Sequence, residues 1–228
     1  MRAIAALIIL VSVSVVNGPS LHAKGRTIQY LGNFQRTGFY NVSNLIDAPA
    51  IKWKEKQYQH RAFKACSFGR ELLFAGCWLN CVSLSSGEER WESKATYGFP
   101  EVPVLHKGTA FLCSAVPTLY AWDIRADKEL WSMKLKEGQV DAPARWRNLL
   151  ILPSDGNTLQ AIDVDKRKVC WRLKVAGSPS AVTIFRKTGL AAINDGGVVS
   201  FDLRTGKQRW QILKGQRCIA PPLVINRT

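Results

Sequence analysis

The sequence has no CxxC pair, no adjacent cysteines and only three histidines, His22, His60 and His106, which lie far apart. Without a CxxC pair a structural zinc site is disfavoured, and the separated histidines show no acid–base constellation. Beyond the first residues, no stretch approaches the ~20 apolar residues that a membrane span needs. Acidic residues are also scarce, because 17 Asp and Glu stand against 32 Lys and Arg.

Residues 1–23 differ from the rest of the chain. Arg2 is followed by the apolar run 3–16 and then by the small and turn-forming residues 17–23. One positive charge, an apolar stretch of roughly 7–15 residues and a small-residue exit are typical of a secretory signal peptide. We therefore predict a signal peptide at 1–23, cleaved after Gly18 or Ala23, with an uncleaved anchor as the alternative. No cysteine lies near the exit, so a bacterial lipoprotein anchor is not supported.

Export would permit disulfides, and the chain has six cysteines. We expect five of them in or beside strands, where a free thiol behaves as a small apolar side chain. These five are Cys77, Cys81, Cys113, Cys170 and Cys218. Buried thiols and one or two disulfides are both compatible with this pattern.

The formal net charge of +15 favours anionic partners through long-range attraction. The basic residues are spread over segments such as 52–56, 165–174, 185–189 and 213–217. They form neither an aromatic-interleaved RNA signature nor a helical basic stripe. We therefore predict a solvated basic exterior and no nucleic-acid site, with binding of anionic envelope polymers as an alternative use of that surface.

Tryptophans recur along the chain with a period near 40 residues. Five of them are separated by 38, 40, 40 and 39 residues: Trp53, Trp91, Trp131, Trp171 and Trp210. Eight positions before the last four stand Ser83, Asp123, Asp163 and Asp202. A period of this length indicates a repeat architecture.

Each repeat has the pattern of antiparallel strands, and no stretch shows a helical period of 3.6 residues. In the unit 142–171, a turn is expected at Arg147-Asn148 and another at Asp155-Gly156, with Asp195-Gly196 in the same slot forty residues later. The segments around these turns are apolar or alternate at period two. We predict three hairpin-linked strands and a fourth short one per unit, which gives an all-β fold, a β-propeller of four-stranded blades.

The repeated residues have structural roles in this interpretation. Each tryptophan is expected to fill the gap between adjacent blades, because a blade buries its apolar faces only by stacking on the next. Each aspartate is expected to accept hydrogen bonds from N–H groups of the following turn. Ligand stacking on the tryptophans is the less favoured reading.

The predicted organisation follows the repeat. After the signal peptide come a lead-in segment and strand at 24–53, four units at 54–91, 92–131, 132–171 and 172–210, and part of a fifth at 211–228. Four or five such units would form an open arc with unpaired end faces. We expect a partial propeller; association of two arcs into a ring and closure as a small propeller are the alternatives.

Three segments resemble the PQQ-type propeller repeat, whose pattern is LYALDxxTGKxxW. They are LYAWDIRADKELW (119–131), LQAIDVDKRKVCW (159–171) and VVSFDLRTGKQRW (198–210). The segment YLGNFQRTGFY (30–40), followed by IKWK (51–54), is similar to the lead-in of secreted bacterial members. The resemblance covers residues 30–228 and implies the propeller fold. It does not specify the function, which differs between groups of the family.

The family includes quinoprotein dehydrogenases that bind pyrroloquinoline quinone (PQQ) and calcium, cofactor-free scaffolds of outer-membrane β-barrel assembly, and exported propellers of unassigned role. The dehydrogenases carry adjacent cysteines, which this chain lacks, and the oxygen ligands at Asp155-Gly156-Asn157 and Asn194-Asp195 fall in hairpin slots. The resemblance therefore implies no cofactor and no catalytic or metal-binding residues.

The function implied is an exported, non-enzymatic scaffold that binds protein partners in the bacterial envelope, in outer-membrane protein assembly or in sensing. It would lie in the periplasm or at the cell surface, peripheral to a membrane at most. The alternative is a fragment of a PQQ-dependent dehydrogenase that oxidises alcohols or sugars with PQQ and calcium.

Overall fold

A computed structural model describes residues 64–93, 98–99, 101–139, 141–218, 220–222 and 224. The predicted signal peptide at 1–23, the lead-in at 24–53 and Trp53 lie outside the described residues. Within the described part of the chain, no helix is long and apolar enough to cross a membrane.

The described residues form four antiparallel sheets of four strands, each paired in chain order. Blade 1 contains β1 (Lys64–Phe68), β2 (Glu71–Ala75), β3 (Leu79–Ser83) and β4 (Glu89–Ser93). Blade 2 contains β5 (Val104–His106), β6 (Thr109–Cys113), β7 (Thr118–Asp123) and β8 (Lys128–Lys134). Blade 3 contains β9 (Ala144–Trp146), β10 (Leu149–Ser154), β11 (Thr158–Asp163) and β12 (Lys168–Lys174). Blade 4 contains β13 (Thr183–Phe185), β14 (Thr188–Ile193), β15 (Gly197–Asp202) and β16 (Gln208–Ile212).

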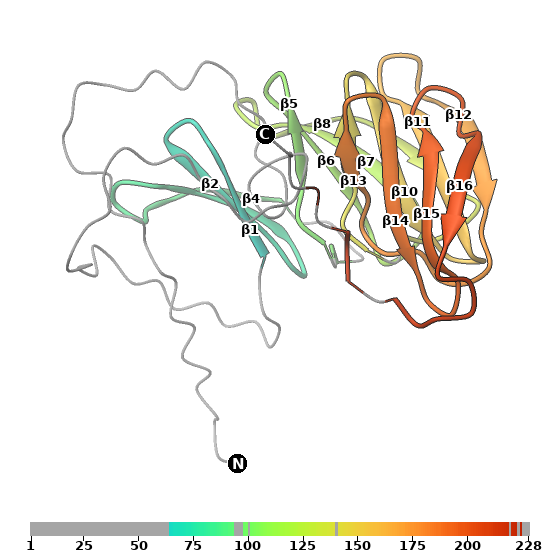
Figure 1. The fold of residues 1–228 in the computed structure, drawn as a ribbon. Coiled ribbons are helices and arrows are strands. Elements are labelled where there is room, and N and C mark those ends of the chain that lie inside the picture. Colours follow the sequence, from blue (N-terminus) through green and yellow to red (C-terminus); the bar gives the residue numbers. More distant parts are fainter. Residues whose placement is uncertain are drawn as a thin grey trace, which may run out of the picture.

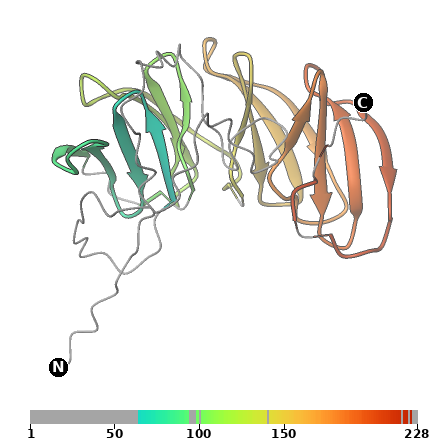
Figure 2. The same cartoon turned by 60° about the vertical axis from the view of Figure 1, so that its left-hand side comes forward.

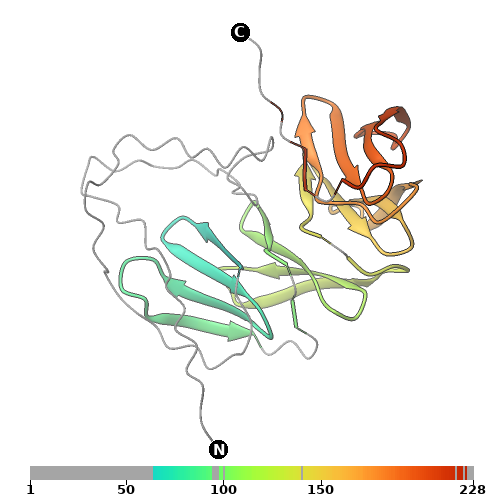
Figure 3. The same cartoon turned by 60° about the horizontal axis from the view of Figure 1, so that its bottom comes forward.

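The four blades stand side by side in chain order (Figures 1 and 2), and they follow an arc when seen from another side (Figure 3). The predicted fold class, an all-β partial propeller with four-stranded blades, is therefore confirmed. In blades 2 to 4 the short strand is the first one, because β5, β9 and β13 have three residues each. In blade 1 the first strand, β1, has five residues. Each sheet ends two or three residues after the repeated tryptophan of its unit.

In blades 3 and 4, the hairpin loop between the second and third strands has three residues, one more than the two-residue turns predicted from the sequence. Ser154 pairs with Thr158, so three residues, 155–157, form the loop in blade 3. In blade 4, Ile193 pairs with Gly197 and the loop is 194–196. Asp195, with a φ of 59°, therefore corresponds to Gly156, with a φ of 66°. The predicted alignment of Asp195 with Asp155 was wrong by one residue, because unit 4 is one residue shorter upstream of this hairpin.

Every blade has a β-bulge beside its repeated tryptophan. The register shifts follow Cys81, Ala121, Ala161 and Ser200, which pair with the tryptophans of their own blades. The extra residue is the one before the tryptophan, for example Leu130 in β8 and Cys170 in β12. A bulged residue has no partner on the neighbouring strand. Both side chains are exposed.

The apolar core lies between consecutive blades. In β10, Leu149 and Ile151 belong to a buried cluster shared with blade 4, whereas Leu150 and Leu152 belong to one shared with blade 2. Successive side chains of a strand point to opposite faces of the sheet. All six residues of β10 are therefore buried. A third cluster joins blades 1 and 2 in the same way.

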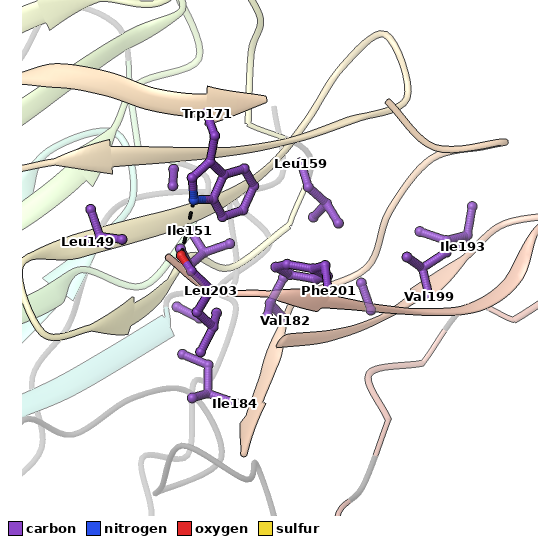
Figure 4. Close-up of a cluster of buried hydrophobic side chains, with 13 residues drawn as sticks. Leu149, Ile151, Leu159, Trp171, Val182, Ile184, Ile193, Val199, Phe201 and Leu203 are labelled. Atoms are coloured by element: carbon purple, nitrogen blue, oxygen red, sulfur yellow. Dashed lines mark hydrogen bonds between the residues drawn. The ribbon is translucent and has the colours of Figure 1, made fainter. Parts of the chain in front are cut away.

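Trp171 joins blade 3 to blade 4 (Figure 4). Its side chain is 8% exposed, and its ring lies edge-on to Phe201 with the centroids 5.6 Å apart. Its Nε1 donates a hydrogen bond of 3.0 Å to the carbonyl of Leu203 in the next blade. Gly206 contacts the same ring so closely that a Cβ there would lie 2.5 Å from it. The aromatic ring thus contributes both apolar burial and a directed bond across the interface.

The other described tryptophans of the repeat show how this position depends on a following blade. Trp91 is half-buried and donates from Nε1 to the carbonyl of Ile124 in blade 2 at 3.0 Å. Trp131 is half-buried and packs on the cluster between blades 2 and 3. Trp210 is instead 44% exposed, because no described sheet follows blade 4. The expectation that each ring is enclosed between blades therefore does not hold for Trp210 in the described part of the chain.

Replacing Trp171 with alanine should lower the free energy of unfolding by about 3–5 kcal/mol, because the change removes a large side chain from a packed core. Trp210→Ala is the matched control, since it removes the same side chain at the same repeat position from an exposed site. It should cost less than about 1 kcal/mol. Urea unfolding followed by circular dichroism measures both. Equal losses for the two variants would contradict the role assigned to Trp171.

Candidate interaction surfaces

The repeated aspartates organise the turns between the third and fourth strands. Oδ1 of each aspartate accepts hydrogen bonds of 2.9–3.0 Å from the N–H groups two and three residues later. The acceptors are Asp123, Asp163 and Asp202, and in blade 1 the hydroxyl of Ser83 accepts a longer bond from the N–H of Ser86. The carboxylates therefore hold the four residues that follow them in a fixed turn.

Asp202 has the largest set of partners. Its Oδ2 accepts a bond of 2.8 Å from Nη2 of Arg209, in addition to the turn N–H groups of Arg204 and Thr205 on Oδ1. The hydrogen bond from Arg209 is the main reason that the pKa of Asp202 falls to about 2, and the turn N–H groups add to the effect. Hydrogen bonding to the ionised form favours that form.

The turns fall into two sets, one at each end of the blades. Because consecutive strands are antiparallel, the first turn of a blade and its third turn emerge at one end. The second turn and the connection to the next blade emerge at the other. We call the first set the basic turn face; it comprises 69–70, 84–88, 107–108, 124–127, 147–148, 164–167, 186–187 and 203–207.

Contacts between neighbouring blades place these turns side by side. The ring of Phe68, at the end of β1, lies against Gly108 in the first turn of blade 2. Nε1 of Trp146 in blade 3 donates to the carbonyl of Arg186 in the first turn of blade 4, at 3.0 Å. Between blades 2 and 3, the guanidinium of Arg167 lies 5.7 Å from the ring centroid of Trp131. The basic turn face is therefore continuous along the arc.

The two ends of the blades differ in charge. The basic turn face has ten basic residues and three acidic ones, Glu88, Asp127 and Asp165. The basic ones are Arg70, Lys107, Arg125, Arg147, Lys166, Arg167, Arg186, Lys187, Arg204 and Lys207. At the opposite end, the described turns and connections have three basic residues, Lys136, Lys214 and Arg217, and five acidic ones, Glu101, Glu137, Asp141, Asp155 and Asp195.

This segregation corrects the sequence-based view that the basic residues lack organisation. A usable signal was present, because Lys107, Arg147 and Arg186 each follow the first strand of their unit. All three adopt positive φ angles of 50–56°. Periodicity does not reveal these turns, because the first strands of blades 2 to 4 have only three residues each.

Cationic side chains lie near His106, where blades 2 and 3 meet. Burial lowers the pKa of His106, and the nearby cations Arg145 and Lys107 lower it further, against an opposing effect of Asp165. Nη1 of Arg145 donates to the carbonyl of Arg147 at 2.6 Å, and the guanidinium of Arg147 lies 4.9 Å from the ring centroid of Trp146. The positive potential favours the neutral form of this histidine.

At the opposite end, the second turns of blades 1 and 2 are uncharged and partly apolar. Trp78 is 37% exposed in the turn 76–78, and Val116 is 46% exposed in the turn 114–117. The N–H of Phe99 donates to the carbonyl of Gly76, and the N–H of Ala115 donates to the carbonyl of Gly98 at 3.1 Å. Residues 98–99 therefore tie the two turns together. We call the exposed residues Cys77, Trp78, Ala115 and Val116 the apolar turn patch.

All six cysteines are free thiols in the structure. Cys66, Cys81 and Cys113 are buried, and burial raises the pKa of each thiol to about 12. Cys66 lies in β1, although it was not among the five cysteines predicted from the sequence to lie in or beside a strand. Cys77 and Cys170 are exposed, because one lies in a turn and the other is a bulged residue.

The described residues include no group of three or more His, Cys, Asp or Glu side chains that could hold a metal ion. The oxygen ligands considered from the sequence occupy the second turns of two different blades, at 155–157 and 194–196.

A family model described as outer membrane protein assembly factor BamB matches residues 77–217, which is more than half of the chain. The chain belongs to this family. The match confirms the PQQ-type repeat recognised in the sequence, and BamB-like propellers are typically non-enzymatic and bind proteins. No curated protein matches the chain.

Solved structures share the fold at low sequence identity. BamB from Moraxella catarrhalis is 16% identical with a TM-score of 0.53, over 63% of this chain and 46% of that one. The computationally designed protein Ika8 is 12% identical with a TM-score of 0.62, over 73% and 53%. Sqt1 from Saccharomyces cerevisiae is 11% identical with a TM-score of 0.57, over 63% and 45%. This chain matches only about half the length of each.

We expect the Asp202 carboxyl to titrate with a pKa of about 2, below the value near 3.9 of an unperturbed aspartate. Because the folded-state pKa is depressed, the contribution of Asp202 to stability is present above about pH 4 and is lost as the pH falls toward 2. Arg209→Gln removes the main cause, so the pKa should rise toward its ordinary value. Carboxyl carbon NMR measures this, with Arg90→Gln, at the same repeat position in blade 1, as control. An unchanged Asp202 titration in Arg209→Gln would refute the assignment.

Proposed function

We propose that this chain is an exported, non-enzymatic propeller scaffold that binds protein partners in the bacterial cell envelope, in outer-membrane protein assembly or sensing. Membership of the BamB family supports protein binding, and the signal-like segment at 1–23 supports export. The single structural observation that carries the proposal is the apolar turn patch on blades 1 and 2.

The composition of the patch suits a protein partner. Tryptophan is enriched among residues that dominate binding energy, because it combines a large apolar area with one polar group. Neither turn contains a charged residue. A partner that covers Trp78 and Val116 therefore does not strip water from a charged side chain of these turns, which would be costly.

The rigidity of the patch also favours binding. The backbone hydrogen bonds through Gly98 and Phe99 hold both turns before any partner arrives. Beneath them, Phe99 is buried and packs edge-on against Tyr120, with ring centroids 5.9 Å apart. A surface that is already ordered loses less conformational entropy on binding. The expected partner is an envelope protein that presents an uncharged, apolar segment.

Site-specific photocrosslinking tests this proposal. A benzophenone side chain placed at position 78 should crosslink a discrete envelope protein in the source bacterium, and the same group at position 130 should not. Leu130 is a suitable control because it is an apolar residue of comparable exposure, 48%, on the outer strand β8. Equal crosslinking from the two positions, or none from position 78, would contradict the proposal.

The double variant Trp78→Ser/Val116→Ser should weaken retention of the crosslinked partner by roughly 30-fold or more, since a binding hot spot contributes at least about 2 kcal/mol. Leu130→Ser should leave retention unchanged. Binding is measured with the purified partner by calorimetry, and unfolding curves show that each variant is folded. An unaltered affinity in the double variant would exclude the patch as the binding surface.

A further inference from the structure

The basic turn face contains no large exposed apolar side chain among the described residues. The large apolar side chains with 37–51% exposure lie elsewhere: Trp78 and Val116 in second turns, Leu130, Trp210 and Ile212 in outer strands, and Leu213 after β16. A partner at this face would therefore be held by charge and hydrogen bonding. Such binding is reversible and weakens as salt increases.

The basic residues of this face extend over all four blades, and their number rises along the arc from one in blade 1 to two, three and four in blades 2, 3 and 4. Every blade has a basic residue in its first turn: Arg70, Lys107, Arg147 and Arg186. The third turns of blades 2 to 4 add at least one exposed basic residue each. A small anion could meet only the few charges of one blade junction. An extended anionic surface could meet all four blades at once.

We propose that the basic turn face docks this protein onto an anionic phospholipid membrane surface. Basic residues near such a surface are attracted by its negative potential, and the attraction decays within a Debye length. The turns that emerge at one end of four adjacent blades place ten basic side chains on the same side of the molecule. Docking by this face leaves the apolar turn patch, at the other end of the blades, directed away from the lipid.

The ring of Trp146, at the end of β9 beside this face, is not available as a stacking platform for nucleic acid bases. Trp146 is covered by the guanidinium of Arg147 at 4.9 Å, and its Nε1 is bonded to the carbonyl of Arg186. Sequence-tolerant binding of single strands relies on open aromatic faces beside a basic groove. The geometry therefore favours a lipid surface over a nucleic acid.

The test compares two triple variants of the full chain that change the net charge equally. Lys107→Glu/Lys166→Glu/Lys187→Glu reverses three exposed residues of the basic turn face. Lys134→Glu/Lys136→Glu/Lys214→Glu reverses three exposed lysines at the other end of the blades. Sedimentation measures the partition coefficient with phosphatidylcholine vesicles, with and without phosphatidylglycerol. The readout is the ratio of the two coefficients, because the apolar run 3–16 is common to every variant and contributes to both.

The unaltered chain should prefer anionic vesicles, and the preference should fall as the Debye length shortens from about 10 Å to 3 Å. A basic residue near an anionic surface contributes about five-fold to partitioning, so the variant of the basic turn face should lose about 100-fold or more. The control variant should change less than ten-fold. Circular dichroism verifies folding, and Lys107→Gln/Lys166→Gln/Lys187→Gln repeats the test without added negative charge.

Three results would overturn the proposal. The first is equal partitioning of the unaltered chain into anionic and neutral vesicles. The second is an equal loss in both glutamate variants, which would mean that total charge and not this face determines binding. The third is displacement from the vesicles by inorganic phosphate at constant ionic strength, which would identify a compact phosphate site in place of a membrane surface.

Discussion

The fold depends on the contact between a tryptophan in the outermost strand of one blade and the third turn of the next. The indole N–H of Trp171 bonds to the Leu203 carbonyl, and that of Trp91 bonds to Ile124 in the corresponding turn. A carbonyl at the start of a turn lacks a partner within its own sheet, and burying it unpaired would be costly. The ring therefore satisfies a polar group while it fills the apolar space between two sheets.

This contact determines where the variable surfaces lie. It fixes one end of a blade against its neighbour at the junctions of blades 1 and 2 and of blades 3 and 4. Between blades 2 and 3 the guanidinium of Arg167 lies over the ring of Trp131, so the first and third turns of the four blades form one continuous face. The second turns form another. The interior is specified by side chains that alternate between the two sides of each strand, as Leu150 and Ile151 do. The turns are not subject to this alternation of buried side chains, and the two ends of the blades differ. One end has a net positive charge, whereas the other has few basic residues and includes the apolar turn patch.

The fold could be predicted from the sequence because the repeat is long and keeps the same residue types at the same positions. Tryptophan, aspartate and alternating apolar residues recur in register, and each has a local physical reason. The surfaces could not be predicted in the same way. Trp78 stands outside the repeat, and its turn is joined to that of Val116 by backbone hydrogen bonds through Gly98 and Phe99, which are distant from it in the chain. The basic turns recur after first strands of only three residues, which are too short to show a period. Trp210 shows the converse, because a perfect match to the repeat says nothing of whether a neighbour covers it.

Hydrogen exchange at the indole nitrogens tests the central contact most directly. In the full chain with ¹⁵N-labelled tryptophan, the Nε1 protons of Trp91 and Trp171 should exchange slowly, because each is bonded to a carbonyl of the next blade. The Nε1 proton of Trp210, whose side chain is 44% exposed, should exchange at nearly the rate of a free indole. Exchange of Trp171 as fast as that of Trp210 would show that the blades are not joined by this bond.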